Sequence, residues 1–519
     1  MRTGGVLPVY LEEEKSGSGM TALAGLIPYV ELIHAAGVRS SIERHIHLRD
    51  SGQGWTPAQM VTAGILLNLA GGDCVDDLDR LNADAGFGQV LRQVECHKMA
   101  RRERREMERR FRKGRDRNVV SPSAMRRFLK EFHDEEQEKL RVQGKAFIPA
   151  PNAHLQGLRQ TNWGVTAFSC SRKRPKSLTL DIDAVVIDSE KENALYCYEG
   201  HKGYQPLNVY LAELGIVAHS EFRDGNVPAG YDIQRVTDES LEQLVRFAGA
   251  TVEFAVRSDT AAYDTNYLRY LHSGGNGRLK DAEGTPRPVW FAIGVPVTAA
   301  VKEAAAKHSV EWEPLMRRKS DGTVGKTNQE WAVIPFVPGS LSRSKKDPDF
   351  QFIAIREVHE PQLTLPGMEQ EQPQLPFPTV ELEGVIYKLH VVVSNRDWEG
   401  DRIIWWYRER CGKSEEIHAA MQHDYAGGKM PSDLFGANAA WWGIMILAMN
   451  LNQIMKRQVL GGKWAEKRLK AIRHSIINLP GRVVEHGRQL FLRLAKGDPG
   501  FGLLVAMRRG VAVLAAAPG

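Results

Sequence analysis

Carboxylate side chains stand in or at the ends of three apolar segments of this 519-residue sequence. Asp181 and Asp183 lie in the stretch LTLDIDAVV, Asp259 ends the stretch FAVRSD, and Glu415 and Glu416 lie in a helical pattern. Carboxylates are depleted in strands and are costly to bury without a partner. When several gather at one sheet edge they repel one another, and hard divalent cations relieve that repulsion. Two such ions about 3.5–4 Å apart can stabilise the attacking and leaving oxygens of a phosphodiester.

Each of these acids also has a purely structural explanation. An Asp at the end of a strand usually belongs to a turn or a cap, and two acids at the start of a helix interact favourably with its dipole. Three acid-bearing elements associated with one α/β unit are better explained by a shared site. The sequence therefore predicts carboxylates that hold divalent cations beside a phosphodiester.

The elements that must position these acids begin with an α/β unit between residues 176 and 260. Leu178, Leu180 and Ile182 alternate with other residues, as in a strand with one buried face. Strand patterns follow at 194–200, 204–215, 216–225 and 251–259, and a helical pattern lies at 239–249. This succession predicts an α/β fold with a mixed sheet.

The rest of the chain divides into helical and β-rich regions. Thr56 and Ser121 each precede a proline and an apolar stripe, which is typical of a capped helix start. Short apolar strands separated by Gly and Pro lie further along, before another helical region. We expect a helical region at 1–140, a connector at 141–175, a core at 176–269 and 391–455, a β-rich insertion at 270–390, and a basic C-terminal region at 456–519.

Positive charge is concentrated between Lys98 and Lys130. This segment holds fourteen Lys or Arg against four Asp or Glu, a net charge of +10, whereas the whole chain carries only +6. Such a block is typical of a protein that binds the phosphate backbone of nucleic acid, although a solvated helix face is the simpler alternative. We expect phosphate contacts from four arginines, and contacts to base edges from two more near a helix start; these are Arg101, Arg102, Arg104 and Arg105, then Arg126 and Arg127.

Several protein classes are disfavoured by composition. Five cysteines without a CxxC pair argue against a disulfide framework or a structural zinc site, and suit a reducing cytoplasm. The longest apolar run, at 441–449, is far shorter than the roughly 20 residues of a membrane helix, and the first residues lack an apolar signal segment. We therefore expect a cytoplasmic protein without membrane contact.

Six motifs together carry a resemblance to a known family. They are LDIDA, GYQPL with RDGNVPAG, VRSD, VVSN, YRERCGKSEEIH and FGANAAWW. With these motifs the chain resembles the DDE transposases of insertion sequences, over roughly residues 120–495. The group in question has an RNase H-like catalytic domain with an all-β insertion, and the 156 positions between Asp259 and Glu415 leave room for one.

The resemblance implies that Asp183, Asp259 and Glu415 are the three catalytic, metal-binding acids. Asp181 is the alternate to Asp183, which is preferred because a small residue, Ala184, follows it. The family usually has Thr at the next position, where this sequence has Val185.

The third acid belongs to a family signature of Tyr, Arg, Glu and Lys, which implies DNA contacts by Tyr407 and Arg410. Four residues, one more than usual, separate Arg410 from Glu415, so Glu416 is an alternate. Gln422 stands where the signature has Lys. The cationic phosphate contact would then pass to Lys413 or Arg410, or this element is impaired.

The activity implied is metal-dependent cleavage at transposon ends, followed by strand transfer of the freed 3′-OH into target DNA. Two Mg²⁺ or Mn²⁺ ions would be the cofactors. Terminal inverted repeats and target DNA would be the partners of a homodimer in a synaptic complex, at the nucleoid. One alternative is a catalytically impaired, transposase-derived DNA-binding protein. Another is a glycosidase with two carboxylates, although a neutral glycan offers no partner for the basic segment.

Overall fold

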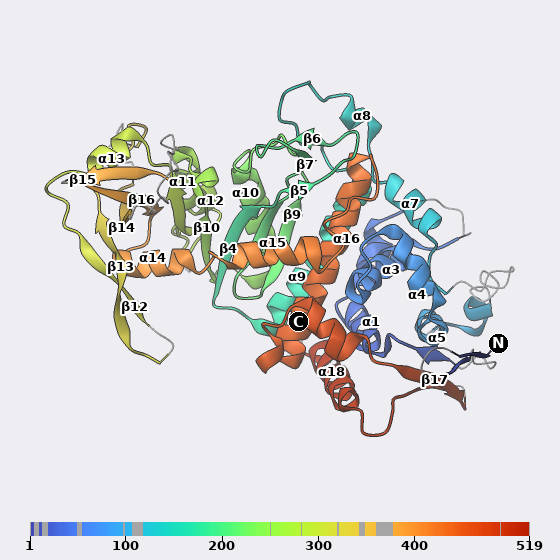
Figure 1. The fold of residues 1–519 in the computed structure, drawn as a ribbon. Coiled ribbons are helices and arrows are strands. Elements are labelled where there is room, and N and C mark those ends of the chain that lie inside the picture. Colours follow the sequence, from blue (N-terminus) through green and yellow to red (C-terminus); the bar gives the residue numbers. More distant parts are fainter. Residues whose placement is uncertain are drawn as a thin grey trace.

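The computed structural model describes residues 2–4, 10–12, 19–48, 54–96, 99–105, 118–249, 251–281, 283–318, 321–341, 348–359, 377–382, 384–487 and 489–517. The molecule is elongated, with a β-rich lobe at one side, a sheet in the middle and a helical lobe at the other side (Figure 1). Apolar side chains of all three parts contribute to the buried core.

The central sheet is built around β4 (Ser177–Ala184), the strand that carries Asp181 and Asp183. On one side β4 pairs antiparallel with β8 (Leu207–Leu211), which pairs antiparallel with β9 (Ile216–Glu221). On the other side β4 pairs in parallel with β10 (Glu253–Ser258), which pairs in parallel with β11 (Trp290–Val295). This order and these directions are those of the RNase H-like mixed sheet expected from the sequence.

The β-rich region extends this sheet instead of forming a sheet of its own. Its last strand, β16 (Val385–Ser394), pairs antiparallel with β11 of the core. The order continues from β16 through β14, β13 and β12, and β15 also pairs with β16. These strands are β12 (Glu313–Arg318), β13 (Val324–Val333), β14 (Gln351–Val358) and β15 (Thr379–Leu382).

The expected start of the insertion at residue 270 is wrong. α11 (Thr265–His272) spans that boundary and β11 lies beyond it, yet β11 pairs directly with β10. The apolar stretch around β11 has the same composition as the insertion strands, so local pattern alone did not separate them. The inserted strands therefore begin with β12, after α13 (Ala299–Ala305).

The expected connector at 141–175 contains a long helix, which corrects that expectation. α9 (Ala153–Lys173) begins at Asn152, whose side chain accepts hydrogen bonds from the backbone N–H groups of His154 and Leu155. It packs against β9, α10 (Ile233–Ala248) and α16 (Phe435–Ile454). Its apolar stripe is interrupted by buried polar residues such as Thr161 and Asn162, which explains why the sequence pattern did not indicate a helix.

The N-terminal helical region packs on α16. The two expected caps are confirmed: Thr56 begins α3 (Pro57–Ala70) with a capping box, and Ser121 begins α7 (Pro122–Lys130). Both helices contact α16, which is almost wholly buried. The other described helices of this region with more than five residues are α1 (Ile27–Ala35), α2 (Val38–His45), α4 (Leu78–Ala83) and α5 (Ala85–Glu95).

The two ends of the chain meet in one small sheet. β17 (Gly481–His486) pairs with both β18 (Gln489–Arg493) and the N-terminal strand β3 (Met20–Thr21). The last helix, α18 (Pro499–Ala516), lies against α1. Among the described residues, α18 is the one unbroken helix that is long and apolar enough to cross a membrane. Arg508, in the middle of α18, forms an ion pair with Glu31 of α1 at 2.7 Å. The length and composition of one such helix are weak evidence for a membrane span.

Candidate active site

Asp183 and Asp259 lie at adjacent positions on neighbouring strands. In the parallel pairing of β4 with β10, Ile182 is opposite Ser258, and each Asp is the next residue on its strand. Neighbouring strands lie about 4.7–4.9 Å apart, so the two carboxylates emerge side by side at the carboxyl end of the sheet. Asp259 also begins a short 3-10 helix, and its Oδ1 accepts a hydrogen bond from Ala261 N at 3.0 Å.

The carboxylate of Asp183 is partly buried and is paired with an arginine. Its Oδ2 accepts a hydrogen bond from Arg410 Nη2 at 2.9 Å, and its Oδ1 accepts one from Ala184 N at 3.0 Å. Burial raises the pKa of Asp183 to about 6; the charge of Asp259 adds to this rise, whereas Arg410 and the Ser414 hydroxyl oppose it. The two acids are therefore close enough to repel each other.

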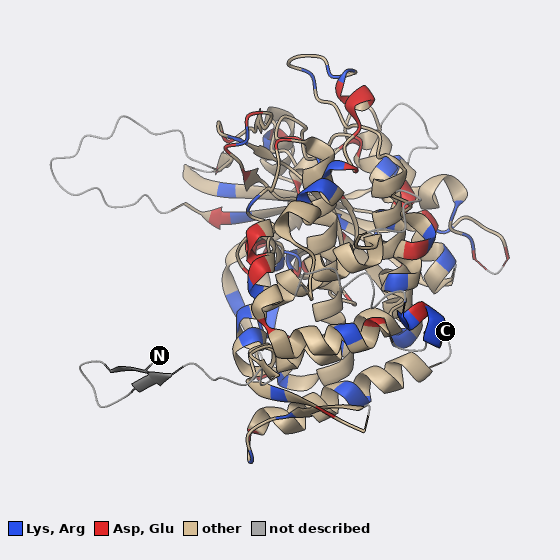
Figure 2. Ribbon diagram, turned by 90° about the vertical axis from the view of Figure 1, so that its right-hand side faces the viewer, with Lys and Arg blue, Asp and Glu red and all other residues tan. Residues whose placement is uncertain are grey.

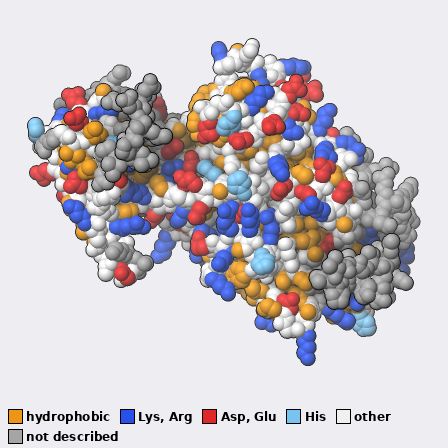
Figure 3. All heavy atoms as spheres, viewed as in Figure 1, with side chains coloured by type: hydrophobic (Ala, Val, Ile, Leu, Met, Phe, Trp, Pro, Cys, Tyr) orange, Lys and Arg blue, Asp and Glu red, His pale blue; other side chains and the backbone are white. Residues whose placement is uncertain are grey.

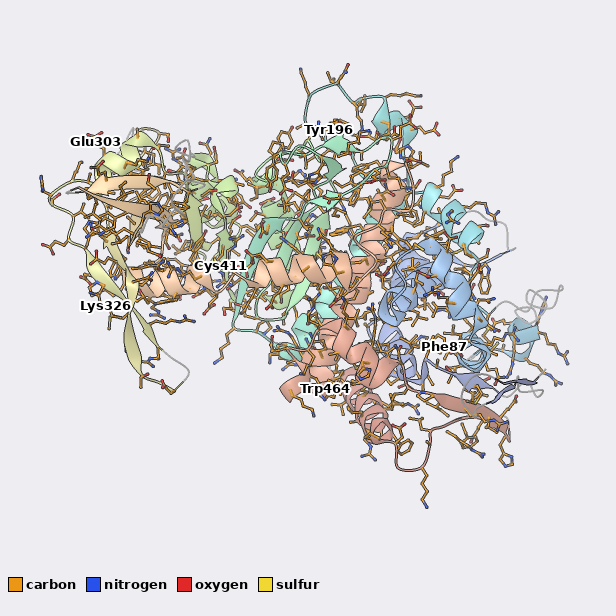
Figure 4. The ribbon with its side chains drawn as sticks, in the orientation of Figure 1. Phe87, Tyr196, Glu303, Lys326, Cys411 and Trp464 are labelled. Atoms are coloured by element: carbon orange, nitrogen blue, oxygen red, sulfur yellow. The ribbon has the colours of Figure 1, made fainter. Side chains whose placement is uncertain are left out.

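The third acid comes from a helix that follows a sharp break. α14 (Gly400–Arg408) and α15 (Lys413–His423) are separated at Gly412, whose φ of 77° suits glycine. Figure 4 marks Cys411 at this break, where the β-rich lobe meets the central sheet. Glu415 lies in the first turn of α15 and is exposed.

The helical repeat places Glu415 on the face of α15 that turns toward the two aspartates. His418 and Gln422 follow at three and seven positions, so they share this face, and both line an open cavity together with Asp183 and Asp259. Glu415 itself does not line the cavity; it lies in the first turn of α15, one turn before His418. Glu416, also exposed, is rotated by about 100° from it.

His418 was not indicated by the sequence analysis. Burial lowers the pKa of His418 to about 4, with an opposing contribution from Glu415, so its imidazole is neutral at pH 7. The three-residue spacing after Glu415 is the signal that could have identified it. Gln422 Nε2 donates a hydrogen bond to Val186 O at 2.6 Å, which ties α15 to the chain just after β4.

Asp181 is held in a structural ion pair. Arg257 on β10 donates from Nε and Nη2 to its two oxygens, at 2.7 and 2.9 Å. The same guanidinium donates from Nη1 to Trp406 O at 2.6 Å and to Glu409 at 2.9 Å. Asp181 and Arg257 are both buried, and this ion pair joins β4, β10 and α14. Because both Asp181 oxygens are bonded to Arg257, this arrangement argues against Asp181 as a metal ligand.

The cavity has a volume of about 1420 Å³ and is lined by both acidic and basic side chains. Lys429 and Lys470 line it together with the two aspartates. In the space-filling view, Lys and Arg side chains gather in the middle of the molecule, beside His and acidic side chains (Figure 3). Adjacent carboxylates at one wall match the oxygen ligands that Mg²⁺ and Mn²⁺ prefer, so the residues fit a divalent-metal site.

The expected DNA-contacting residues are spread over two regions. Tyr407 lies beside the central sheet: its hydroxyl is close to Gly294 of β11, and burial raises the pKa of Tyr407 to about 12. Lys413 is exposed at the start of α15. Arg410 is 7% exposed and engages Asp183, so it is available to DNA only if that ion pair opens.

The described arginines of the basic segment are exposed. Arg101, Arg102, Arg104 and Arg105 are exposed in a short helical segment, and residues 106–117, which hold six of the other basic residues, lie outside the described residues. Arg126 forms an exposed ion pair with Asp76 at 2.6 Å. Arg127 is exposed on α7. Figure 2 faces the helical lobe and shows basic and acidic positions interspersed on its helices.

A comparison with protein families decides the class of the protein. The family described as transposase DDE domain group 1 matches residues 9–307, more than half of the chain. The chain belongs to the DDE transposase family. The matched range contains Asp183 and Asp259 and ends before the helix that carries Glu415. The resemblance noted in the sequence is thereby confirmed for the family.

Solved structures similar to this DDE-family chain include a cryo-EM structure of a piggyBac transposase synaptic complex with hairpin DNA. The two chains share 12% sequence identity and superpose with a TM-score of 0.36. The match covers 88% of this chain and 81% of the piggyBac transposase chain. No curated protein sequence matches the chain.

Proposed function

We propose that this DDE-family protein cleaves DNA at the ends of a transposon and joins the freed 3′-OH to target DNA. The observation that carries the proposal is the adjacency of Asp183 and Asp259 at the carboxyl ends of β4 and β10, in an open cavity. Membership of the family supports the same conclusion. Asp183, Asp259 and Glu415 are the proposed catalytic acids.

These three acids would hold two Mg²⁺ or Mn²⁺ ions. Such ions, when bound, activate the attacking oxygen and stabilise the leaving oxygen of a phosphodiester. The protein supplies the position of each acid: two are fixed by the strand register, and the third by the start of α15. Arg410 balances the charge of Asp183 and restrains its carboxylate. Neutral His418 adds a nearby group that can accept a proton or a hydrogen bond.

DNA is the proposed partner at two places. Lys429 and Lys470 on the cavity wall, with Lys413 and Tyr407 nearby, would contact the phosphates of the strand being cut. The helical region 1–140, with its basic segment, would hold the terminal inverted repeat. Because two ends must be brought together, a homodimer on DNA is part of the proposal, with the nucleoid as its place of action.

The proposal is tested with a DNA fragment that carries the inverted repeats flanking the coding sequence. Asp183→Asn, Asp259→Asn and Glu415→Gln should each abolish Mg²⁺-dependent strand cleavage while binding the fragment nearly as wild type does. Glu416→Gln is the matched control for Glu415→Gln, because it changes the neighbouring acid on another face of α15.

Two other results would change the proposal. If Glu416→Gln were inactive and Glu415→Gln active, the third acid would be Glu416. If wild type bound the fragment without nicking it in Mg²⁺ or Mn²⁺, the protein would be the impaired DNA-binding form. Two features favour that form: Val185, where the family usually has Thr, and Gln422, whose amide is bonded to Val186 O and carries no positive charge.

A further inference from the structure

A group of metal-ligand side chains lies in a hairpin at the rim of the cavity, apart from the three acids. The hairpin joins β6 (Leu195–Tyr196) to β7 (Lys202–Tyr204). In its turn, Cys197, Glu199 and His201 each offer one donor atom, and these atoms all lie within 4.8 Å of one another. Figure 4 labels Tyr196, the residue that precedes this turn.

The turn that presents these side chains is closed by its own backbone. Cys197 N donates a hydrogen bond to His201 O at 2.8 Å, and Gly200 N donates one to Cys197 O at 3.1 Å. Gly200 has a φ of 86°, which favours glycine and lets the chain reverse direction. Gly225 packs so closely against this hairpin that a Cβ there would lie 2.5 Å from Leu195 O. The three donors are therefore held on one compact turn.

A fourth side chain lies beside the imidazole of this group. Asp188, on β5 (Ile187–Asp188), lies with its Oδ1 2.7 Å from His201 Nε2. Glu199 Oε2 lies 3.9 Å from the same nitrogen. β5 pairs with β7, with Asp188 opposite Gly203, so the strand register brings Asp188 close to His201. A carboxylate next to a ligating histidine is a common second partner in metal sites.

We propose that Cys197, Glu199 and His201 bind a Zn²⁺-type ion. Thiolate and imidazole ligands select borderline-soft ions such as Zn²⁺ over Mg²⁺. Zinc–ligand bonds of about 2.0–2.3 Å in a tetrahedron place donor atoms roughly 3.3–3.8 Å apart, so donors already within 4.8 Å need to approach by about 1 Å. Three protein ligands leave the fourth position for water.

This ion can bind whether or not the protein cleaves DNA, whereas its role at the cavity rests on the proposed function. Cys197, Glu199 and Asp188 line the same cavity as Asp183 and Asp259. Cys197 is buried, whereas the side chains of Glu199 and His201 are 46% and 38% exposed, so an ion from solvent can reach the group. The bound ion would lock the hairpin at the cavity rim, where a DNA strand would enter.

Titration with Co²⁺, a spectroscopic substitute for Zn²⁺, tests the site directly. The full-length protein carries Asp183→Asn and Asp259→Asn, so that binding at the catalytic acids does not contribute. One equivalent of Co²⁺ per chain should produce the charge-transfer absorption of a cobalt–thiolate bond, and Zn²⁺ should displace it. Cys197→Ser should abolish that absorption, and Asp188→Asn should weaken binding by about 10- to 100-fold.

The matched control is Cys411→Ser, because Cys411 is an exposed cysteine in the break between α14 and α15. It should keep both the absorption and the affinity. Glu199→Gln, at a half-exposed position, should weaken Co²⁺ binding even if Cys197→Ser fails to fold. No thiolate absorption in the parent protein, or equal absorption in the parent and Cys197→Ser proteins, would overturn the proposal.

Discussion

Asp181 and Arg257 form a bidentate ion pair across β4 and β10, with nitrogen–oxygen distances of 2.7 and 2.9 Å. Asp183 lies two residues further along the same strand and meets Arg410 through one oxygen only, at the edge of an open cavity. Two carboxylates on one face of a strand therefore have different environments. One is sealed between elements of the fold, and the other reaches the cavity wall.

Asp181→Asn is expected to destabilise the fold by up to about 3–5 kcal/mol, because the buried Arg257 guanidinium keeps only the exposed Glu409 as a carboxylate partner. Urea denaturation followed by circular dichroism measures the change in the free energy of unfolding. Glu416→Gln, at an exposed position, should shift it by less than about 0.5 kcal/mol. A stable Asp181→Asn protein that cannot cleave DNA would instead make Asp181 the catalytic acid.

The pKa of Asp183 predicts a pH-dependent stability in the absence of metal. Burial raises the pKa of Asp183 to about 6, above its ordinary value of 3.8, so ionisation is more costly in the folded than in the unfolded protein. The stabilising contribution of the protonated form is complete below pH 3.8 and is lost as the pH rises through 6. Asp183→Asn should match wild type near pH 4 and exceed it by about 1–3 kcal/mol at pH 8.

Thermal denaturation of both proteins across this pH range, in a chelator, measures the difference. Added Mg²⁺ should stabilise wild type selectively, because a ligand that binds the folded state shifts the equilibrium toward it. That stabilisation should weaken below about pH 6, since protons compete with the ion for Asp183. An identical pH profile for wild type and Asp183→Asn would contradict the assigned environment.

Gln422→Lys is expected to strengthen DNA binding. The side chain lies on the cavity wall, near the two aspartates. A lysine there adds one cation, and each phosphate contact steepens the dependence of log affinity on log salt by about 0.9. Binding measured at several salt concentrations gives the slope. Gln422→Met, of similar size and without charge, should leave the slope unchanged, and an equal slope for the two variants would exclude a phosphate at this position.

The parts of the fold that sequence predicted are those set by local chemistry. Helix starts at Thr56 and Ser121 were predicted because a cap and a proline act within a few residues. The strands with Asp183 and Asp259 were predicted because apolar residues mark them as buried. Pairings between distant residues were missed: Arg257 is 76 positions from Asp181, and Arg410 is 227 positions from Asp183.

The boundaries were missed for a related reason. α9 buries polar residues, such as Asn162, which donates to Val217 O and accepts from Asn450, a residue 288 positions away. In the sequence these residues only weaken the helical pattern. β11 likewise resembles the inserted strands in composition, and its place in the core is decided by its parallel partner, β10. The roles of Glu415 and the alternate Glu416 remain predictions to be tested by cleavage.

The basic segment is expected to bind the terminal repeat largely through phosphates. Arg101, Arg102, Arg104 and Arg105 are exposed, and none of them lines the cavity. Replacing all four with Gln should reduce the slope of log affinity against log salt by up to about 0.9 for each arginine–phosphate interaction that is removed. Cleavage of a saturating amount of DNA should persist, because the three proposed acids are unchanged.

Replacing Arg126 and Arg127 with Gln should instead reduce the preference for the repeat over unrelated DNA, if these residues contact base edges. Filter binding to both DNAs at several salt concentrations separates the two effects, and an unchanged slope in the fourfold variant would mean that this segment is only a solvated surface.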